Sequence, residues 1–168
     1  MGGKLKHRSG CPVNISLEIF GDRWSLLIIR DLMVRGFHTF KDFQGSGEGI
    51  ATNILADRLR KLEAAGIITA EPDEADRRSV NYRLTEKGID LAPVLLEILI
   101  WGSRHQEAEA PYEVIEKMAA NREQVLAEVR RRWERRDPTP VLPWLPGPPA
   151  KLRRRERKGS RTESGKAK

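Results

Sequence analysis

Residues 52–88 constrain the fold of this chain most, because a helical pattern there leads directly into a hairpin pattern. At about 100° per residue, Leu55, Leu59 and Leu62 fall within one narrow stripe, which predicts a buried helix face. Arg58 lies at the edge of that stripe. The opposite face is polar and charged, and it carries Asn53, Ala56, Asp57, Arg60 and Lys61. One face of this helix therefore packs against a core, and the other is free to contact a partner.

A short hairpin is expected directly after this helix. Gly66 is expected to end the helix in a left-handed conformation, and residues 67–70 begin a strand. The polar residues 73–78 separate this strand from a second one over residues 80–84, in which apolar and polar side chains alternate. The pattern predicts a two-stranded wing with a charged tip.

Shorter helices are expected before the residue-52 helix. Pro12 suits a first helical position, so the first helix is placed at Pro12–Phe20, and a second runs from Trp24 to about Arg35. A small third helix begins at about Phe40 and leads through a glycine-rich loop into the next one. This order of elements predicts a mainly α (α+β) fold, a winged helix-turn-helix with a two-stranded wing and added dimerisation helices.

The segment after the hairpin carries more apolar residues than one helix stripe holds. Thr85 is expected to cap a single helix that runs to about His105, with a bend at Pro93. One apolar row consists of Ile89, Ala92, Leu96 and Leu99, and a second consists of Leu91, Leu95, Ile98 and Trp101. On a monomer this surface would be exposed, so we expect a second subunit to cover it and the second row to mediate dimerisation.

Composition divides the remainder of the chain. A strongly charged helix is expected at about Pro111–Arg136, and the prolines that follow it predict an extended linker. We therefore expect four regions: a disordered amino terminus at 1–10, the winged helix-turn-helix domain at 11–105, a charged helix at 106–137, and a Pro-rich linker with a disordered basic tail at 138–168.

The positive charge of the chain is concentrated in its tail. Residues 151–168 hold nine Lys and Arg against two Glu, which equals the net charge of +7 of the whole chain. DNA binding by the folded part must then depend on local clusters, on the helix (Arg58, Arg60, Lys61) and on the hairpin (Arg77, Arg78, Arg83). The tail either adds sequence-independent DNA affinity, with Arg130, Arg131 and Arg132 if they are exposed, or acts as a solubilising end.

Several separated motifs resemble the HxlR-type winged helix-turn-helix transcription regulators. They are CPVNISLEIFGDRWSLLIIRDLM, F-x-x-F, GIATNILADRLRKLEAAGII, VNYRLTEKG and WGSRH, in this order over about residues 11–105. The resemblance implies a bacterial homodimer joined through the first helix, with Ile15 and Ile19 as candidates, and through the long helix after the wing. Family members often carry Ser where this chain has Ala51, so Thr52 is left to cap the helix.

The resemblance also implies that the helix from Thr52 enters the major groove. The predicted contacts to base edges are Thr52, Asn53 and Ala56, and those to phosphates are Arg58, Arg60 and Lys61. Arg77 and Arg78 on the wing would reach the adjacent minor groove or backbone. A twofold dimer requires a pseudo-palindromic operator with half-sites about 34 Å apart, or a multiple of that spacing. We expect double-stranded DNA as the partner and repression as the outcome.

Other functions are weighed against this one. The helix charges could be an ordinary solvated face, and a winged helix could serve as a protein-interaction module without specific DNA binding. No cofactor, metal site or enzyme chemistry is expected, since one cysteine and three scattered histidines show no ligand or catalytic spacing. No apolar run approaches the roughly 20 residues that span a bilayer, which predicts a cytoplasmic protein.

Two features suggest a signal that controls the protein. Cys11 stands before Pro12 at a predicted helix start, where the helix dipole favours a thiolate, and members of the family it resembles sense oxidants through a cysteine at this place. The alternative is a small residue without chemistry. Trp24 and Trp101 are expected to pack, although an aromatic-lined gap near a dimer interface could accept a small-molecule effector.

Overall fold

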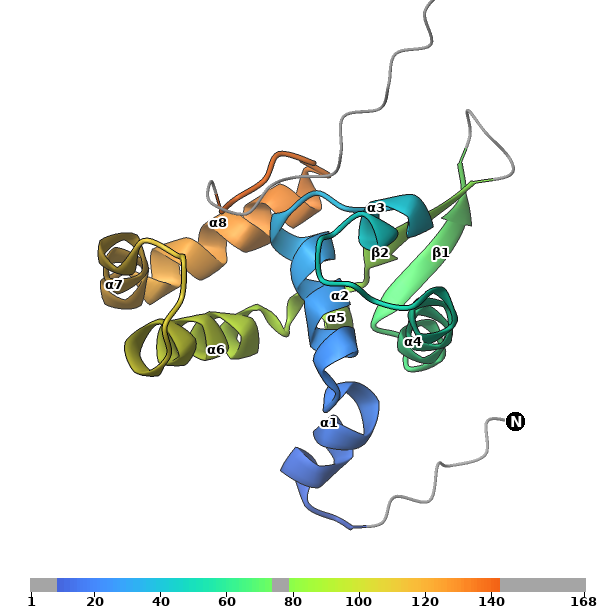
Figure 1. Cartoon of the computed structure of the whole chain (residues 1–168), viewed down its shortest axis with the longest axis horizontal. Helices are drawn as coiled ribbons and strands as arrows, with labels where there is room; N and C mark the ends of the chain where they lie inside the picture. The colour runs from blue at the N-terminus through green and yellow to red at the C-terminus, as the bar shows by residue number, and fades with distance from the viewer. Residues whose placement is uncertain (1–8, 74–78, 143–168) are drawn as a thin grey trace, which may run out of the picture.

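The computed structural model describes residues 9–73 and 79–142 of the chain. It contains a helix-turn-helix unit, a two-stranded wing and a helical extension (Figure 1). Helix α2 runs through the middle of the molecule, with α3, α4 and the wing on one side of it and α6, α7 and α8 on the other. The elements are α1 (Pro12–Phe20), α2 (Arg23–Val34), α3 (Phe40–Gln44), α4 (Thr52–Ala64), β1 (Ile68–Pro72), β2 (Val80–Leu84), α5 (Glu86–Ile89), α6 (Ala92–His105), α7 (Tyr112–Ala120) and α8 (Arg122–Glu134).

Local signals explain where the helix-turn-helix elements begin and end. Thr39 and Asp42 form a reciprocal capping box at the start of α3, which satisfies two backbone N–H groups. Helix α4 begins at Thr52 and ends before Gly66, whose φ of 69° is the left-handed conformation that glycine adopts at low cost. The predicted bounds of α1, α4 and the wing strands are confirmed to within a residue.

The wing is an antiparallel pair whose register runs from Ile68 opposite Leu84 to Pro72 opposite Val80. The segment before α3 adds an isolated bridge between Thr39 and Asn81, and the Tyr82 backbone N–H donates to the His38 carbonyl at 2.7 Å. This bridge ties the base of the wing to the helix-turn-helix unit. The wing is thereby joined to the start of α3.

Two apolar clusters form the core. The larger one lies between α2, α4 and the wing and contains Ile29, Phe43 and the three leucines predicted to be buried in α4, which are Leu55, Leu59 and Leu62. The smaller one joins α6 to α7 through Leu96, Ile100, Ile115 and Ala119. The predicted winged helix-turn-helix fold is therefore confirmed, and a second packing unit is added to it.

The prediction of one helix from Thr85 to His105 is wrong. The Thr85 hydroxyl does accept from the Gly88 backbone N–H, but this cap begins the short helix α5, and a turn at Asp90 and Leu91 separates it from α6. Pro93 lies in the first turn of α6. Backbone N–H groups in a first turn have no acceptor within the helix, so the missing N–H of proline costs no hydrogen bond there. Proline therefore begins a helix here instead of bending one.

The single charged helix predicted at 111–136 is also two helices, because Asn121 breaks it between α7 and α8. Both pack back on the chain, α7 against α6 and α8 against α2 and α6. Their apolar faces cover Leu96 and Ile100. We expected a second subunit to cover the surplus apolar surface of this region, but the chain itself covers one of its two rows and packs against part of the other.

The expected linker does not begin at residue 138. The Val141 backbone N–H donates to the Val34 carbonyl at 2.7 Å, and the Leu142 side chain is buried. Residues 138–142 therefore lie against the end of α2. Two predictions lie outside the described residues. They are the disorder of the amino terminus, which concerns mainly residues 1–8, and the disordered basic tail, which lies within residues 143–168.

Candidate nucleic-acid interface

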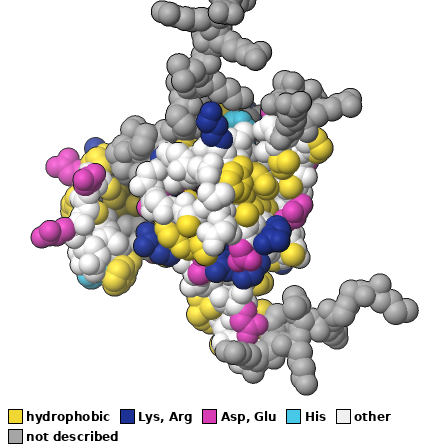
Figure 2. All heavy atoms as spheres, turned by 45° about the vertical axis from the view of Figure 1, so that its right-hand side comes forward, with side chains coloured by type: hydrophobic (Ala, Val, Ile, Leu, Met, Phe, Trp, Pro, Cys, Tyr) yellow, Lys and Arg dark blue, Asp and Glu magenta, His cyan; other side chains and the backbone are white. Residues whose placement is uncertain are grey.

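The face of α4 opposite the core is exposed at both ends of the helix and half-buried in the middle. Thr52 and Asn53 are exposed at its amino end, Ala56 is half-buried one turn later, and Arg60 and Lys61 extend into solvent beyond it. Figure 2 brings this side of the molecule forward and shows Lys and Arg side chains gathered around acidic ones in its lower half. The predicted base-edge and phosphate candidates of α4, with the exception of Arg58, thus share one accessible surface.

Asp57 lies among the cations of this surface. Its carboxylate is 3.0 Å from the Lys61 Nζ, 3.7 Å from Arg58 and 3.9 Å from Arg60. The hydrogen bond from Lys61, together with the three positive charges, holds the pKa of the Asp57 carboxyl below its ordinary value. Asp57 is shared among the three cations, and Arg60 and Lys61 remain exposed to solvent beside it.

Arg58 is placed differently from its two neighbours. Its side chain is 25% exposed against 78% for Arg60, and its Nε lies 3.3 Å from Asp22 Oδ1. Asp22 itself caps α2 by accepting from the Trp24 and Ser25 backbone N–H groups. Arg58 therefore links the middle of α4 to the start of α2 and is less available to a phosphate than Arg60.

The ionisation of Asp22 is stabilised by this arrangement. Partial burial alone would raise the pKa of the Asp22 carboxyl, but hydrogen bonds from Ser25, one of them from its hydroxyl at 2.6 Å, and the charge of Arg58 outweigh it. The net effect is a pKa below the ordinary value. The carboxylate that joins α2 to α4 is therefore charged at neutral pH.

The amino end of α4 is open. Ala51 occupies the cap position, and within the described part of the chain no side chain accepts from the first backbone N–H groups. We expected Thr52 to take over the cap, but its hydroxyl instead accepts from the Gln44 Nε2 at 3.0 Å. The open N–H groups and the positive end of the helix dipole together favour an anion at this end.

The wing arginines cannot be placed in the same way. Arg77 and Arg78 lie outside the described residues, so they stay predictions. Arg83 is half-buried on β2, and burial together with the nearby charge of Arg136 lowers the pKa of its guanidinium. Arg83 lies on the face of β2 opposite the core residues Tyr82 and Leu84, near Arg136.

The arginines of α8 are committed to partners within the chain. Arg130 pairs with Glu86 and Asp90 at 2.9 and 3.0 Å, while Arg131 and Arg132 both pair with Glu128. These contacts argue against the expectation that Arg130, Arg131 and Arg132 add to a DNA-binding surface. Arg130 joins α8 to α5, directly after the wing, whereas the pairs of Arg131 and Arg132 with Glu128 lie within α8.

An apolar strip remains exposed on α6 and α1. Trp101 is 59% and Ile98 47% exposed on α6, and Val94 continues the strip one turn earlier. Leu91 and Leu95, which we also expected at a dimer contact, are half-buried against the larger core. On α1, Val13 and Leu17 are exposed, whereas the predicted Ile15 and Ile19 are half-buried. The i, i+4 spacing of Val13 with Leu17, and of Val94 with Ile98, is the sequence signal that would have found them.

Comparison with known proteins identifies the fold and the class of protein. The sequence profile of the HxlR-like helix-turn-helix family matches residues 19–110, more than half of the chain. The protein belongs to the HxlR-like family. It is therefore a helix-turn-helix transcriptional regulator of a family that is not enzymatic.

Relatives of this HxlR-like protein are found in distant bacteria. It is 31% identical to the HTH-type transcriptional regulator YybR of Bacillus subtilis over 106 residues, which is 63% of this chain and 84% of the relative. It is 35% identical to the HTH-type transcriptional regulator Rv3095 of Mycobacterium tuberculosis over 102 residues, 60% of this chain and 63% of the relative.

Two solved structures have the same fold. The crystal structure of PA1607 is 42% identical with a TM-score of 0.56, over 62% of this chain and 71% of that one. The redox regulator HypR in its oxidized form is 29% identical with a TM-score of 0.52, over 58% of this chain and all of that one. The extension from α7 onward lies beyond the family match.

The other residues predicted to respond to a signal in this HxlR-like protein, Cys11, Trp24 and Trp101, do not lie together in one site. Cys11 is an exposed free thiol at the cap position of α1. Trp24 lies under the Arg23 guanidinium at 4.4 Å, and Trp101 lies against the His105 ring at 5.2 Å. The two tryptophans do not line a common pocket in the described structure.

Within residues 9–73 and 79–142, no group of three His, Cys, Asp or Glu side chains is arranged to hold a metal ion. None of the helices in those ranges combines the length and apolar character that crossing a membrane requires.

Proposed function

We propose that this chain binds a specific DNA site as a homodimer, with α4 of each subunit in the major groove. The observation that carries the proposal is the open, exposed amino half of α4. Asn53 can pair with an adenine edge, while Thr52 and Ala56 present small groups of the kind that meet a thymine methyl. A helix that enters the groove with this end first brings these three side chains to the bases.

Phosphate contacts set the register of the helix. Arg60 and Lys61 are the exposed cations of α4 and follow the base-edge candidates by about one turn. The uncapped N–H groups at the start of α4 offer a further phosphate site. Arg58 would contribute only where a phosphate replaces Asp22, and Arg77 and Arg78 remain proposed contacts of the wing.

The exposed apolar strip supports a dimer. Val94, Ile98 and Trp101 on α6 and Val13 and Leu17 on α1 would be covered by the same strip of a second chain, with Ile15, Ile19, Leu91 and Leu95 packed beneath. Such a dimer presents two copies of α4. The operator would be pseudo-palindromic, with half-sites about 34 Å apart or a multiple of that. A dimer that covers a promoter blocks polymerase, so we propose a repressor.

Footprinting on the DNA upstream of the protein's own gene, and of any divergent neighbour, tests the proposal. We expect two protected half-sites with dyad symmetry for the wild type and loss of both for Asn53→Ala. Lys117→Ala is the matched control, because Lys117 is an exposed cation on α7, on the other side of α2 from α4. A protein-interaction module would protect no site above random DNA at any salt concentration.

Cys11 gives a second proposal, for the signal. The exposed thiols of two subunits would be oxidised by one peroxide molecule to an intersubunit disulfide, with the release of two waters. The fold similarity to a redox regulator favours this step. DNA-binding titrations with and without peroxide test it. Wild type should change affinity and Cys11→Ser should not, whereas equal affinity for both proteins under both conditions contradicts it.

A further inference from the structure

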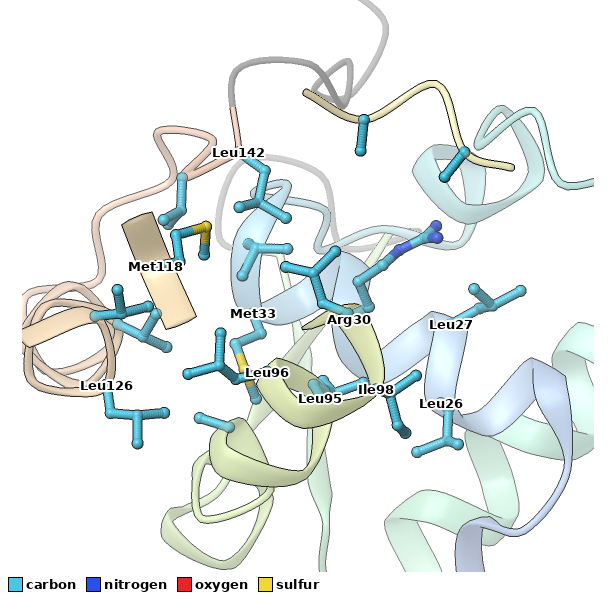
Figure 3. Close-up of a pocket in the computed structure, with 18 of the residues that line it drawn as sticks. Leu26, Leu27, Arg30, Met33, Leu95, Leu96, Ile98, Met118, Leu126 and Leu142 are labelled. Atoms are coloured by element: carbon cyan, nitrogen blue, oxygen red, sulfur yellow. The ribbon is translucent and has the colours of Figure 1, made fainter. Parts of the chain in front are cut away.

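A cavity of about 570 Å³ lies between the helix-turn-helix unit and the extension (Figure 3). Side chains reach it from α2 (Leu27, Met33), α6 (Leu99), α8 (Val125) and the segment before residue 143 (Leu142). Figure 3 shows these elements arranged around a common space. The volume falls in the range of about 300–1,000 Å³ that is typical of small-molecule sites.

The cavity depends on the extension. Helices α7 and α8 and residues 141–142 supply one side of its wall, and all of them lie beyond the part of the chain that matches the family. Residues that do not line the cavity help to hold these helices, and in α8 the Trp133 Nε1 donates to the Leu84 carbonyl at 2.9 Å. The side of the cavity formed by the extension is therefore held by contacts that do not occupy the cavity.

The chemistry of the wall selects the ligand. All but two of the lining residues are aliphatic, alanine or methionine. Arg30 is one exception, and its guanidinium is occupied by Asp31 at 2.8 Å and Glu48 at 3.0 Å and points away from the leucines. Glu109 is the other, and it is exposed together with Ile98 at the mouth. An anionic ligand would find no free cation and would be repelled by Glu109.

We propose that this cavity binds an uncharged, apolar small molecule, such as a fused-ring aromatic compound. Met33 of α2 and Met118 of α7, which both line the cavity, can adapt to the shape of such a ligand. A second subunit on the α6 strip would border the mouth at Ile98 without filling the interior, where Leu96 and Val129 are buried. The site goes beyond DNA binding, and its test does not depend on DNA.

Fluorescence titration of the full chain with N-phenylnaphthylamine, a neutral dye that brightens in apolar surroundings, tests the proposal. We expect saturable binding of one dye per chain. Val125→Trp and Leu99→Trp fill the cavity from two different walls and should each weaken binding about tenfold or more. Gln124→Trp is the matched control, because it adds the same ring to the exposed side of α8 next to Val125. Circular dichroism melting verifies that each variant folds.

A charged analogue tests the chemical class of the ligand. Anilinonaphthalene sulfonate has the same ring system with one negative charge, and we expect it to bind at least about tenfold more weakly than the neutral dye. Equal binding of the two dyes, or equal binding of the neutral dye by all three Trp variants and wild type, would overturn the proposal.

Two other occupants give distinct results. If a second subunit fills the space, dye binding will fall as protein concentration rises through the dimerisation range. If the chain fills it with its own following residues, wild type will bind no dye and Trp144→Ala will bind it. Either result overturns the small-molecule assignment.

Discussion

Asp22 and Ala51 occupy the cap positions of α2 and α4. Only Asp22 has a side chain that accepts hydrogen bonds from the first backbone N–H groups of its helix. The exposure of Asn53 and Arg60 could be predicted from the period of 3.6 residues alone, because burial of the leucine stripe fixes the opposite face. The contact of Arg58 with Asp22 could not be predicted. It joins side chains from two helices, and only their packing brings them together.

Replacing Ala51 with serine should stabilise the protein. Its extended backbone, with φ −68° and ψ 141°, already has the conformation of a cap residue, so a hydroxyl can accept from the open N–H groups of α4. We expect the free energy of unfolding to rise by about 1 kcal/mol in urea titrations. Ala51→Val provides no acceptor and serves as the control. Equal stability of the Ser and Val variants would mean that these N–H groups are already satisfied.

The stabilising effect of Asp22 should depend on pH. Its pKa is lowered in the folded protein, so its contribution is fully present above the unfolded value of about 4 and is lost as pH falls through the lower folded value. Asp22→Asn keeps a cap acceptor but removes the charge. We expect this substitution to lower the free energy of unfolding by about 1 kcal/mol at pH 7. The difference from wild type should shrink as the pH falls below about 4, as measured by urea unfolding.

A matched change on an exposed loop controls for the loss of charge in general. Glu107→Gln removes one carboxylate from the segment between α6 and α7 and should leave the stability curve close to that of the wild type. A deficit for Asp22→Asn that stays constant down to acid pH would show that the amide disturbs packing instead of removing an ion pair.

At the scale of elements, the strongly periodic helices and the wing were predictable, and the breaks between the later helices were not. Asp90 and Leu91 keep right-handed backbone angles through their turn, so the apolar spacing continues almost unchanged from α5 into α6. Pro93 was the available signal, and it indicates a helix start as readily as a bend. The return of residues 138–142 to α2 was hidden because proline-rich composition is typical of linkers.

Gly36 tests how closely this returning segment packs. Its φ of 71° disfavours any side chain, and a Cβ there would lie 1.9 Å from the Pro138 carbonyl oxygen. Gly47 has a similar φ of 85° but open space around it, so Gly47→Ala isolates the backbone strain, about 1–2 kcal/mol. We expect Gly36→Ala to cost more than Gly47→Ala in urea unfolding. Equal costs would contradict the contact between α2 and residues 138–142.

At the scale of the whole molecule, the extension changes what the apolar surface of α6 can do. Composition and helical spacing predicted more apolar surface on this helix than one packed face can bury, and α6 does carry apolar residues on exposed as well as buried faces. They could not assign its cover, because a segment of the same chain and a second subunit would be equally able to pack on this helix. In the structure, Leu96 and Ile100 of α6 pack against α7, and Ile98 and Trp101 are left exposed.

A charge placed in the exposed strip should separate the subunits. Ile98→Asp would bury a carboxylate without a partner at the proposed contact, and we expect sedimentation velocity to shift from dimer to monomer. Val114→Asp places the same charge on the exposed face of α7 and should remain dimeric. Dissociation by Val114→Asp alone would move the subunit contact from α6 to the extension.

The most direct measurement is binding of the intact protein to a footprinted operator duplex, followed by fluorescence anisotropy across a range of salt concentrations. We expect two chains per duplex and preference over random competitor DNA. Arg60→Ala should lower the salt dependence by about one phosphate contact per subunit, while Lys117→Ala should leave it unchanged. A protein that stays monomeric and binds the operator no better than random DNA would contradict the proposal that paired α4 helices read the duplex.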